Sequence, residues 1–114
     1  MADNSNIAIK IAGLLNLALK AGKLILGADN IRTAKGKTVI NAIIIDAGLS
    51  EGTLKKLQRC AGEKNIPFYL FDGKVADIIH KENCKAVGIA DANIWAGLQP
   101  IIVNSTEFKK ILNT

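Results

Sequence analysis

The segment over residues 38–46 constrains the fold more than any other part of the chain. It is rich in Ile and Val, and its apolar residues follow one another without alternating with polar ones. A strand with one exposed face would carry a polar residue at every second position, so this run indicates a strand buried on both faces. We therefore expect residues 38–46 to form a central strand covered by helices on both sides.

Helical and extended patterns alternate along the rest of the chain. Ile7, Ile11 and Leu14 follow the three-to-four spacing of one helix face and predict a helix that ends near Gly22. The other predicted elements are helices at 27–34, 50–64 and 74–80, strands at 23–26, 68–71 and 86–90, one or two helical turns at 92–98 interrupted at Pro100, and a last helix at 105–112. The pattern predicts one α/β domain over residues 1–114, a three-layer α/β/α sandwich with a central mixed sheet of about four strands and a C-terminal extension from about residue 99.

Charge and composition narrow the range of partners. The chain has 15 Lys and Arg against 10 Asp and Glu, a formal net charge of +5, which favours an anionic partner. Aromatic residues make up only 4% of the sequence, which weakens recognition by base stacking, and Cys60 and Trp95 are expected to be packing residues. The apolar runs are shorter than the roughly 20 residues of a membrane span, the N-terminus lacks a secretory pattern, and the two cysteines form no CxxC pair. We expect a cytoplasmic protein with no membrane segment.

Two features of the sequence could suggest a cofactor or a metal site, and we reject both interpretations. Gly36, Lys37 and Thr38 resemble the end of a phosphate-binding loop, in which backbone amides wrap a phosphate and the lysine reaches its outer oxygens. The complete pattern needs a glycine where this chain has Ile31 and a helix where it has the apolar strand. His80 is the only histidine, and no metal-ligand spacing accompanies it. We predict no cofactor and no metal.

Three aspartates, Asp46, Asp72 and Asp91, lie near the predicted ends of strands, where α/β enzymes often place carboxylates. Polar caps of the following helices explain the same positions, and we favour that interpretation. Cys84 lies in a basic loop without an evident base to activate it. An enzyme that acts through Asp46, Asp72 or Cys84 is the least favoured alternative, and we predict that the chain is not an enzyme.

The best candidate for a binding site lies around a short, glycine-led helix. Lys23, Arg32, Lys35 and Lys37 surround this helix, and its first turn, after Gly27, is polar. A helix N-terminus presents unpaired amides, and a glycine there lets the backbone approach an anion or a base edge closely. Short polar side chains in the first turn can then read base edges while the cations hold phosphates. A solvated basic helix is the simpler alternative.

Residues 14–27, with the sequence LLNLALKAGKLILG, are similar to the opening of the L-seven-Ae and L-thirty-e family of ribosomal proteins. The similarity continues in family order, over about residues 10–95, through Gly36, Lys37, Asp46, Ala47, Leu54, Cys60, Asn65, Ile66 and Pro67. Members of this family are α/β/α sandwiches that bind kink-turn RNA, and this chain is most similar to the small bacterial members. The resemblance implies a ribosomal-protein-like RNA-binding domain, with ribosomal RNA among its candidate partners.

In this family a segment of the form G-A-N-E-x-x-K, at the start of the second helix, recognises the sheared guanine and adenine pairs of the kink. The matching residues here are Gly27, Ala28, Asp29, Asn30 and Thr33. Asp29 replaces the asparagine, Asn30 the glutamate and Thr33 the lysine. Asn30 offers both a donor and an acceptor that can replace part of the lost base contacts, and Arg32 and Lys35 can supply positive charge.

The family's second contact is a loop before the last strand that packs on a flipped-out nucleotide, and its match here is residues 80–86. Lysines replace much of the usual small, apolar character of this loop. The predicted RNA-binding residues are Lys23, Gly27, Ala28, Asp29, Asn30, Arg32, Thr33, Lys35, Lys37, Lys81, Asn83, Cys84 and Lys85. The prediction is a protein that recognises a kink-turn or a related structured RNA.

The alternative is a protein-interaction or self-associating module on the same fold. Its apolar surface would be made by Ile25, Leu26, Ile101, Ile102 and Val103, which a protein partner or a second copy would cover. The C-terminal extension fits that use.

Overall fold

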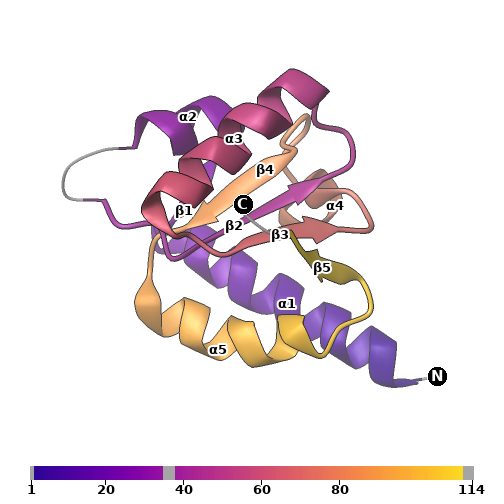
Figure 1. Ribbon diagram of the computed structural model, residues 1–114. Helices are drawn as coiled ribbons and strands as arrows, with labels where there is room; N and C mark the ends of the chain where they lie inside the picture. The colour runs from indigo at the N-terminus through magenta and orange to yellow at the C-terminus, as the bar shows by residue number, and fades with distance from the viewer. Residues whose placement is uncertain (1, 35–37, 112–114) are drawn as a thin grey trace.

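The computed structural model describes residues 2–34 and 38–111, with side chains from residue 7 onward. Helices and strands alternate along the chain (Figure 1). The helices are α1 (Ala2–Lys20), α2 (Ala28–Thr33), α3 (Glu51–Lys64), α4 (Val75–Ile79) and α5 (Ala92–Val103). The strands are β1 (Leu24–Leu26), β2 (Ala42–Asp46), β3 (Phe68–Phe71), β4 (Ala86–Ile89) and β5 (Phe108–Lys110). The predictions made for Lys35, Gly36 and Lys37 lie outside the described residues.

The strands form one mixed sheet in the order β1-β4-β2-β3-β5. β2 and β3 are parallel and joined by α3, whereas β4 is antiparallel to both β1 and β2. β2 lies in the centre, and all five of its residues are buried, as the apolar run predicts. Ile43 belongs to the core on one face of the sheet and Ile44 to the core on the other, so both faces of this strand are used.

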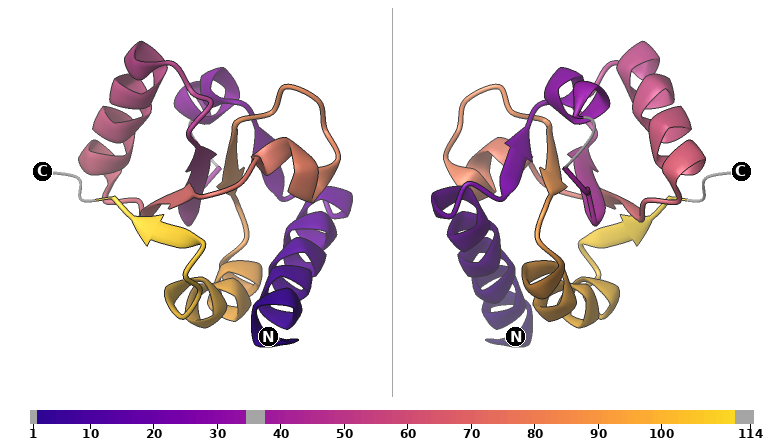
Figure 2. Two further views of the ribbon diagram at one scale, coloured as in Figure 1. Left: turned by 90° about the vertical axis from the view of Figure 1, so that its right-hand side faces the viewer. Right: turned by 90° about the vertical axis from the view of Figure 1, so that its left-hand side faces the viewer.

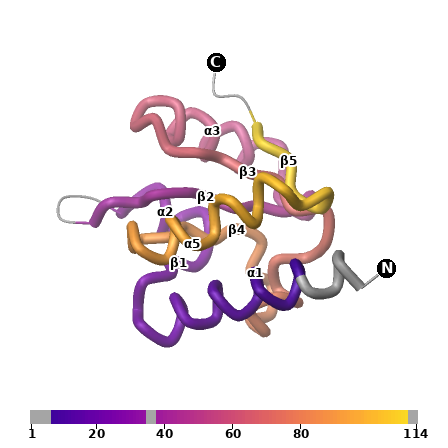
Figure 3. The backbone as a smooth tube through the Cα atoms, turned by 90° about the horizontal axis from the view of Figure 1, so that it is seen from below, coloured from indigo at the N-terminus to yellow at the C-terminus, as the bar shows by residue number. Residues whose placement is uncertain are grey.

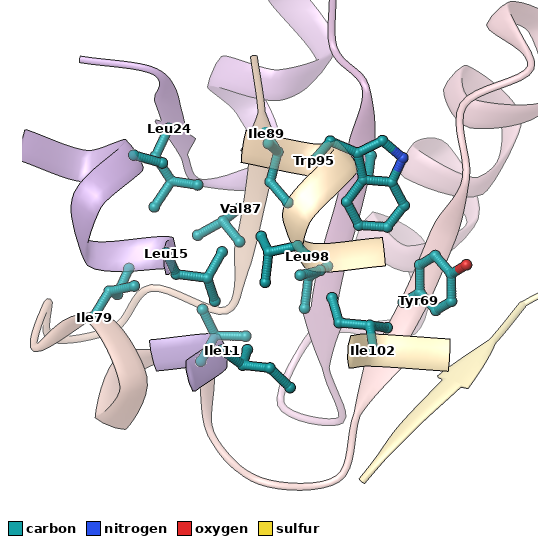
Figure 4. Close-up of a cluster of buried hydrophobic side chains, with 14 of the residues drawn as sticks. Ile11, Leu15, Leu24, Tyr69, Ile79, Val87, Ile89, Trp95, Leu98 and Ile102 are labelled. Atoms are coloured by element: carbon teal, nitrogen blue, oxygen red, sulfur yellow. The ribbon is translucent and has the colours of Figure 1, made fainter. Parts of the chain in front are cut away.

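Helices cover both faces of the sheet (Figures 1 and 2). α2 and α3 lie on one face, over a core that includes Ile31, Leu57 and Phe68. α1, α4 and α5 lie on the other face, where Leu15 and Leu98 belong to the cluster drawn in Figure 4. Figure 3 views the molecule from the side of α1 and α5. The predicted α/β/α sandwich is confirmed, with five strands in place of about four.

The helical turns predicted at 92–98 are part of a longer helix, because α5 continues through Pro100 to Val103. Pro100 removes one backbone hydrogen bond, a cost of about 3 kcal/mol in a helix interior. The residue is exposed, so water can hydrate the carbonyl that loses its partner. Burial of Leu98 and Ile102 on either side of Pro100 holds the helix together across this position.

The last predicted helix is wrong, because the chain forms β5 there and pairs with β3. The Phe108 ring stacks on that of Phe71, with 4.8 Å between the ring centroids. Ring stacking and sheet pairing hold this segment extended, although its polar start at residues 105–107 suggested a helix. Residues 99–111 are therefore part of the domain and not an extension of it.

Candidate nucleic-acid interface

The two ends of the sheet carry different sets of loops. We call the first the Gly27 end: it holds the carboxyl ends of β1, β2 and β3 and the start of β4, and it lies on the right in Figure 1. It comprises residues 27–30, 46–48, 72–74 and 81–85. We call the opposite end the Lys23 end, and it comprises residues 20–23, 38–39 and 64–66. The predicted RNA-binding residues are divided between these two ends.

Gly27 joins the two segments that the family resemblance assigns to RNA contact. Its backbone N–H donates a hydrogen bond of 2.9 Å to the carbonyl oxygen of Ala86, where the second segment meets β4. Its φ is 91°, a conformation that residues with a Cβ rarely adopt, so glycine suits this position. Its carbonyl accepts the N–H of Ile31 inside α2. One residue thus ends β1, begins α2 and places the helix beside loop 81–85.

The polar side chains of α2 are partly occupied within the helix. Asn30 Nδ2 donates to the carbonyl of Leu26 at 2.8 Å. In the part of the chain that the structure describes, this is the one hydrogen bond of that side chain, so its Oδ1 remains available. Arg32 Nη1 lies 2.9 Å from Oδ1 of Asp29, and the Thr33 hydroxyl donates to the Asp29 carbonyl at 2.8 Å. The charge of Arg32 is therefore partly offset, and the hydroxyl of Thr33 is engaged in a hydrogen bond within α2.

Loop 81–85 is a compact turn with exposed polar side chains. Asn83 has a left-handed φ of 62°, which Asn tolerates better than most residues. Cys84 is buried, and its thiol donates to the carbonyl of Ala86 at 3.3 Å. Cys84 therefore anchors the loop. The prediction that its side chain contacts RNA is wrong, because that side chain is buried. Lys81, Asn83 and Lys85 are exposed and can make contacts.

Asp46 fixes the Gly27 end from the inside. Its side chain is buried, Oδ1 accepts the N–H of Gly48 at 2.8 Å, and Oδ2 accepts the N–H of Val75 at 2.8 Å. The carboxylate thus closes the turn after β2 and caps α4. A Cβ on Gly48 would lie 2.9 Å from Asp46 Oδ1 and 3.3 Å from the stem of Lys85, so the turn leaves no room for one. The structural role favoured from the sequence is confirmed for Asp46, but the cap is on α4 and not on the helix that follows β2 in the chain.

A pocket of about 760 Å³ opens at this end between the turns that follow β2 and β3 and loop 81–85. Asp46, Asp72 and Cys84, the three groups of the enzyme alternative, all line it. Both carboxylate oxygens of Asp46 are bound to backbone amides, however, and the Cys84 thiol is bound to a carbonyl. Since an acid–base pair requires a mutual contact, this arrangement favours structural roles for Asp46 and Cys84.

Lys23 does not lie with the other predicted contact residues. It precedes β1, and its carbonyl accepts the N–H of Ala90 just after β4, at the Lys23 end. The strand β1 separates it from Gly27. Lys23 is exposed and contributes to a different hollow from the one at the Gly27 end.

The remaining sequence candidates have structural roles. Asp91 caps α5 by accepting the N–H of Ile94 at 2.9 Å, as predicted. Trp95 is buried beside Tyr69, with 5.8 Å between ring centroids, which confirms packing, whereas Cys60 is only partly buried. Within residues 2–34 and 38–111, no three His, Cys, Asp or Glu side chains form a group able to hold a metal ion. Over the same residues, no helix combines the length and apolar character of a membrane span.

Comparison with known proteins extends the description of the fold. No family model matches the chain, and no curated protein matches it. A solved structure described as that of a protein with unknown function from Bacillus halodurans is similar, with 25% sequence identity and a TM-score of 0.74. The match covers 83% of this chain and 98% of that chain. The similarity therefore concerns the architecture of the domain.

Proposed function

We propose that the chain binds structured RNA through the Gly27 end and recognises a kink-turn or a related kinked helix. The observation that carries the proposal is the hydrogen bond between Gly27 and Ala86, because it joins the glycine-led helix to loop 81–85. Exposed polar groups from both segments, among them Asn30 and Asn83, can then meet one RNA molecule. A kinked RNA presents base edges and backbone together, which suits two contact segments held side by side.

Charge at the Gly27 end favours selective over general RNA contact. The exposed acids within its residues are Asp29, Asp72 and Glu82, and the exposed cations are Lys74, Lys81 and Lys85. Three acids balance three cations, so the attraction of this end for phosphates in general is weak. Affinity must then come from shape and from hydrogen bonds to base edges, which are the contacts that carry selectivity.

The altered motif in α2 changes how such contacts are made. Asn30 keeps Oδ1 as an acceptor for a base amino group, in place of the glutamate of the family motif. Asp29 holds Arg32 at 2.9 Å, so an RNA phosphate has to compete with a carboxylate for that guanidinium. We propose that recognition is retained through Asn30 and the backbone around Gly27, with lower affinity than the full family motif would give.

The test is binding of the purified chain, at two salt concentrations, to three RNAs: a kink-turn, a straight duplex of equal length, and the same kink-turn with its guanine and adenine pairs replaced. We expect the intact kink-turn to bind about tenfold more tightly than either control, with a ratio that persists at the higher salt. Equal binding to all three RNAs that fades with salt would contradict the proposal, because charge alone would then explain it.

A matched pair of variants assigns the contact to the Gly27 end. Lys85→Gln removes a cation from loop 81–85, and Lys56→Gln removes an exposed cation from α3 with the same change in net charge. Only the first should lower the ratio of kink-turn to duplex affinity. Loss of the same size in both variants would place the specific contact elsewhere.

Self-association is the second candidate function, and one observation favours it. α5 has no charged residue, and the exposed large apolar side chains Ile9 and Leu17 on α1 and Val103 on α5 lie in the same layer. Of the residues first predicted for an apolar surface, Ile102 is buried, Val103 is exposed, and Ile25, Leu26 and Ile101 are partly buried. Light scattering of the full chain and of a Leu17→Lys variant tests this candidate: a dimer that the variant disrupts would support it, and two monomers would exclude it.

A further inference from the structure

We propose that the Lys23 end of the sheet is a second nucleic-acid surface, which holds the phosphates of an RNA helix by charge and without sequence preference. This end lies on the left in Figure 1, across the sheet from Gly27. Naming RNA as the polyanion rests on the proposed function. The surface itself rests on two hollows, an exposed apolar residue and an excess of positive charge.

Two neighbouring hollows form the surface. One has a volume of about 350 Å³ and is lined by Lys23 together with Thr38 and Val39. The other has a volume of about 190 Å³ and is lined by Lys64 together with the same Thr38 and Val39. The two lysines therefore line neighbouring hollows that share Thr38 and Val39, so both can face one nucleic-acid backbone.

The apolar side chain that the two hollows share, that of Val39, is open to solvent. Val39 is 67% exposed, which is unusual for a β-branched residue next to a buried strand. A small inorganic anion would not use this side chain. A nucleotide chain can pack a ribose against it while the flanking lysines hold phosphates, so the chemistry of the surface fits a nucleic-acid backbone.

Positive charge exceeds negative charge at this end. Lys20, Lys23 and Lys64 are exposed there, and the acids that border this end in sequence are Glu63 and Asp91. The Asp91 carboxylate is engaged in capping α5. Lys64 donates to a backbone carbonyl at 3.5 Å, the limit for such a bond, and a lysine ammonium has three donors. In contrast to the balanced Gly27 end, this end can gain affinity by releasing counterions from phosphates.

The test measures binding of the full chain to a straight RNA duplex over a range of salt concentrations. The variant is Lys23→Gln with Lys64→Gln, and the control is Lys10→Gln with Lys56→Gln, which removes the same charge from exposed lysines elsewhere. We expect the variant to lose about tenfold in affinity at low salt and to flatten the plot of log K against log salt by about 2, since each phosphate contact contributes about 0.9. The control should change the affinity by less than a factor of two and leave the slope unchanged.

The outcomes separate this inference from the proposed function. Equal losses in variant and control would overturn it, as would failure of the unaltered chain to bind the duplex at low salt. The ratio of affinities for the intact and the base-replaced kink-turn should stay the same in the Lys23 and Lys64 variant, because that ratio reports on the Gly27 end. If kink selectivity is absent while duplex binding still depends on Lys23 and Lys64, the proposed function fails and this surface stands. Thermal melting of each variant verifies that the fold is intact.

Discussion

The Gly27 end and the Lys23 end are built from the same strands, yet they differ in net charge and in whether their polar groups stabilise turns or face solvent. At the Gly27 end, acids and cations balance, and Asp46 and Cys84 turn inward to fix the turns. At the Lys23 end, exposed lysines face solvent around Val39. The first arrangement is suited to reading a shape, because its geometry is fixed from within. The second is suited to holding a polyanion of any sequence.

This difference shows how a small domain can place selective binding and general affinity for phosphates on separate surfaces. General attraction to phosphates requires only accessible cations and depends steeply on salt. Selective recognition requires contact groups that hydrogen bonds within the protein already hold in position before the ligand binds. A chain that assigns these tasks to opposite ends of one sheet allows each to be altered alone.

The largest expected effect compares the aspartates at the two ends. Asp46→Ala leaves two backbone N–H groups without their acceptor, one of them on buried Val75, and should lower the free energy of unfolding by about 3 kcal/mol. Asp91→Ala removes a helix cap and should cost only about 1 kcal/mol. Urea unfolding measures both values. Equal losses would show that Asp46 has no special role in the Gly27 end.

The next effect compares two glycines at the ends of β1. Gly27→Ala forces a side chain into a φ of 91° and should cost about 2 kcal/mol while lowering kink-turn selectivity. Gly22→Ala also meets a positive φ, of 72°, and should cost about 1 kcal/mol with selectivity unchanged. Melting and RNA binding are measured on both variants. If kink-turn selectivity is unchanged in Gly27→Ala, the assignment of selectivity to the Gly27 end is wrong.

A gain of function sharpens the account of the altered motif. The triple change Asp29→Asn, Asn30→Glu and Thr33→Lys introduces into α2 the pattern of the kink-turn-binding family that the sequence resembles, and it frees Arg32 from its carboxylate partner. We expect affinity for the kink-turn to rise about tenfold, or about 1.4 kcal/mol, with little change for the straight duplex. Equal increases for both RNAs would mean that the change adds only charge.

The smallest effect concerns Cys84. Cys84→Ser keeps a donor for the Ala86 carbonyl but places a more polar group in a buried site, so stability should fall by about 1 kcal/mol. Cys60→Ser, at a partly buried position on α3, should change stability by less than half of that. Thermal melting distinguishes them. A larger loss for Cys60 would contradict the assignment of Cys84 as the anchor of loop 81–85.

The sequence predicted the parts of the fold that depend on local pattern. The buried run of β2 and the alternation of helices and strands were sufficient for the α/β/α sandwich, since periodicity reports directly on buried faces. β5 escaped prediction because its partners, β3 and the ring of Phe71, are distant in sequence. Pro100 misled the prediction of α5, because burial of its neighbours overrides the local cost.

The candidate site was predicted only in part. The resemblance selected two segments, and the structure brings Gly27 and loop 81–85 together. The resemblance could not assign Lys23 to an end of the sheet, because the direction of β1 is known only from its pairing with β4. The sequence favoured a capping role for Asp46 but could not identify α4 as the capped helix, because Val75 is 29 residues away.

The most direct test of the separation between the two ends is a titration of the isotope-labelled chain with the kink-turn RNA at low and at high salt, followed through backbone amide chemical shifts. The account predicts large shifts at Gly27, Asn30 and Asn83, which disappear when the guanine and adenine pairs of the RNA are replaced. Shifts at Lys23 and Val39 should depend on salt and not on the kink. Amides at the Gly27 end that do not respond to the intact kink-turn would contradict the account.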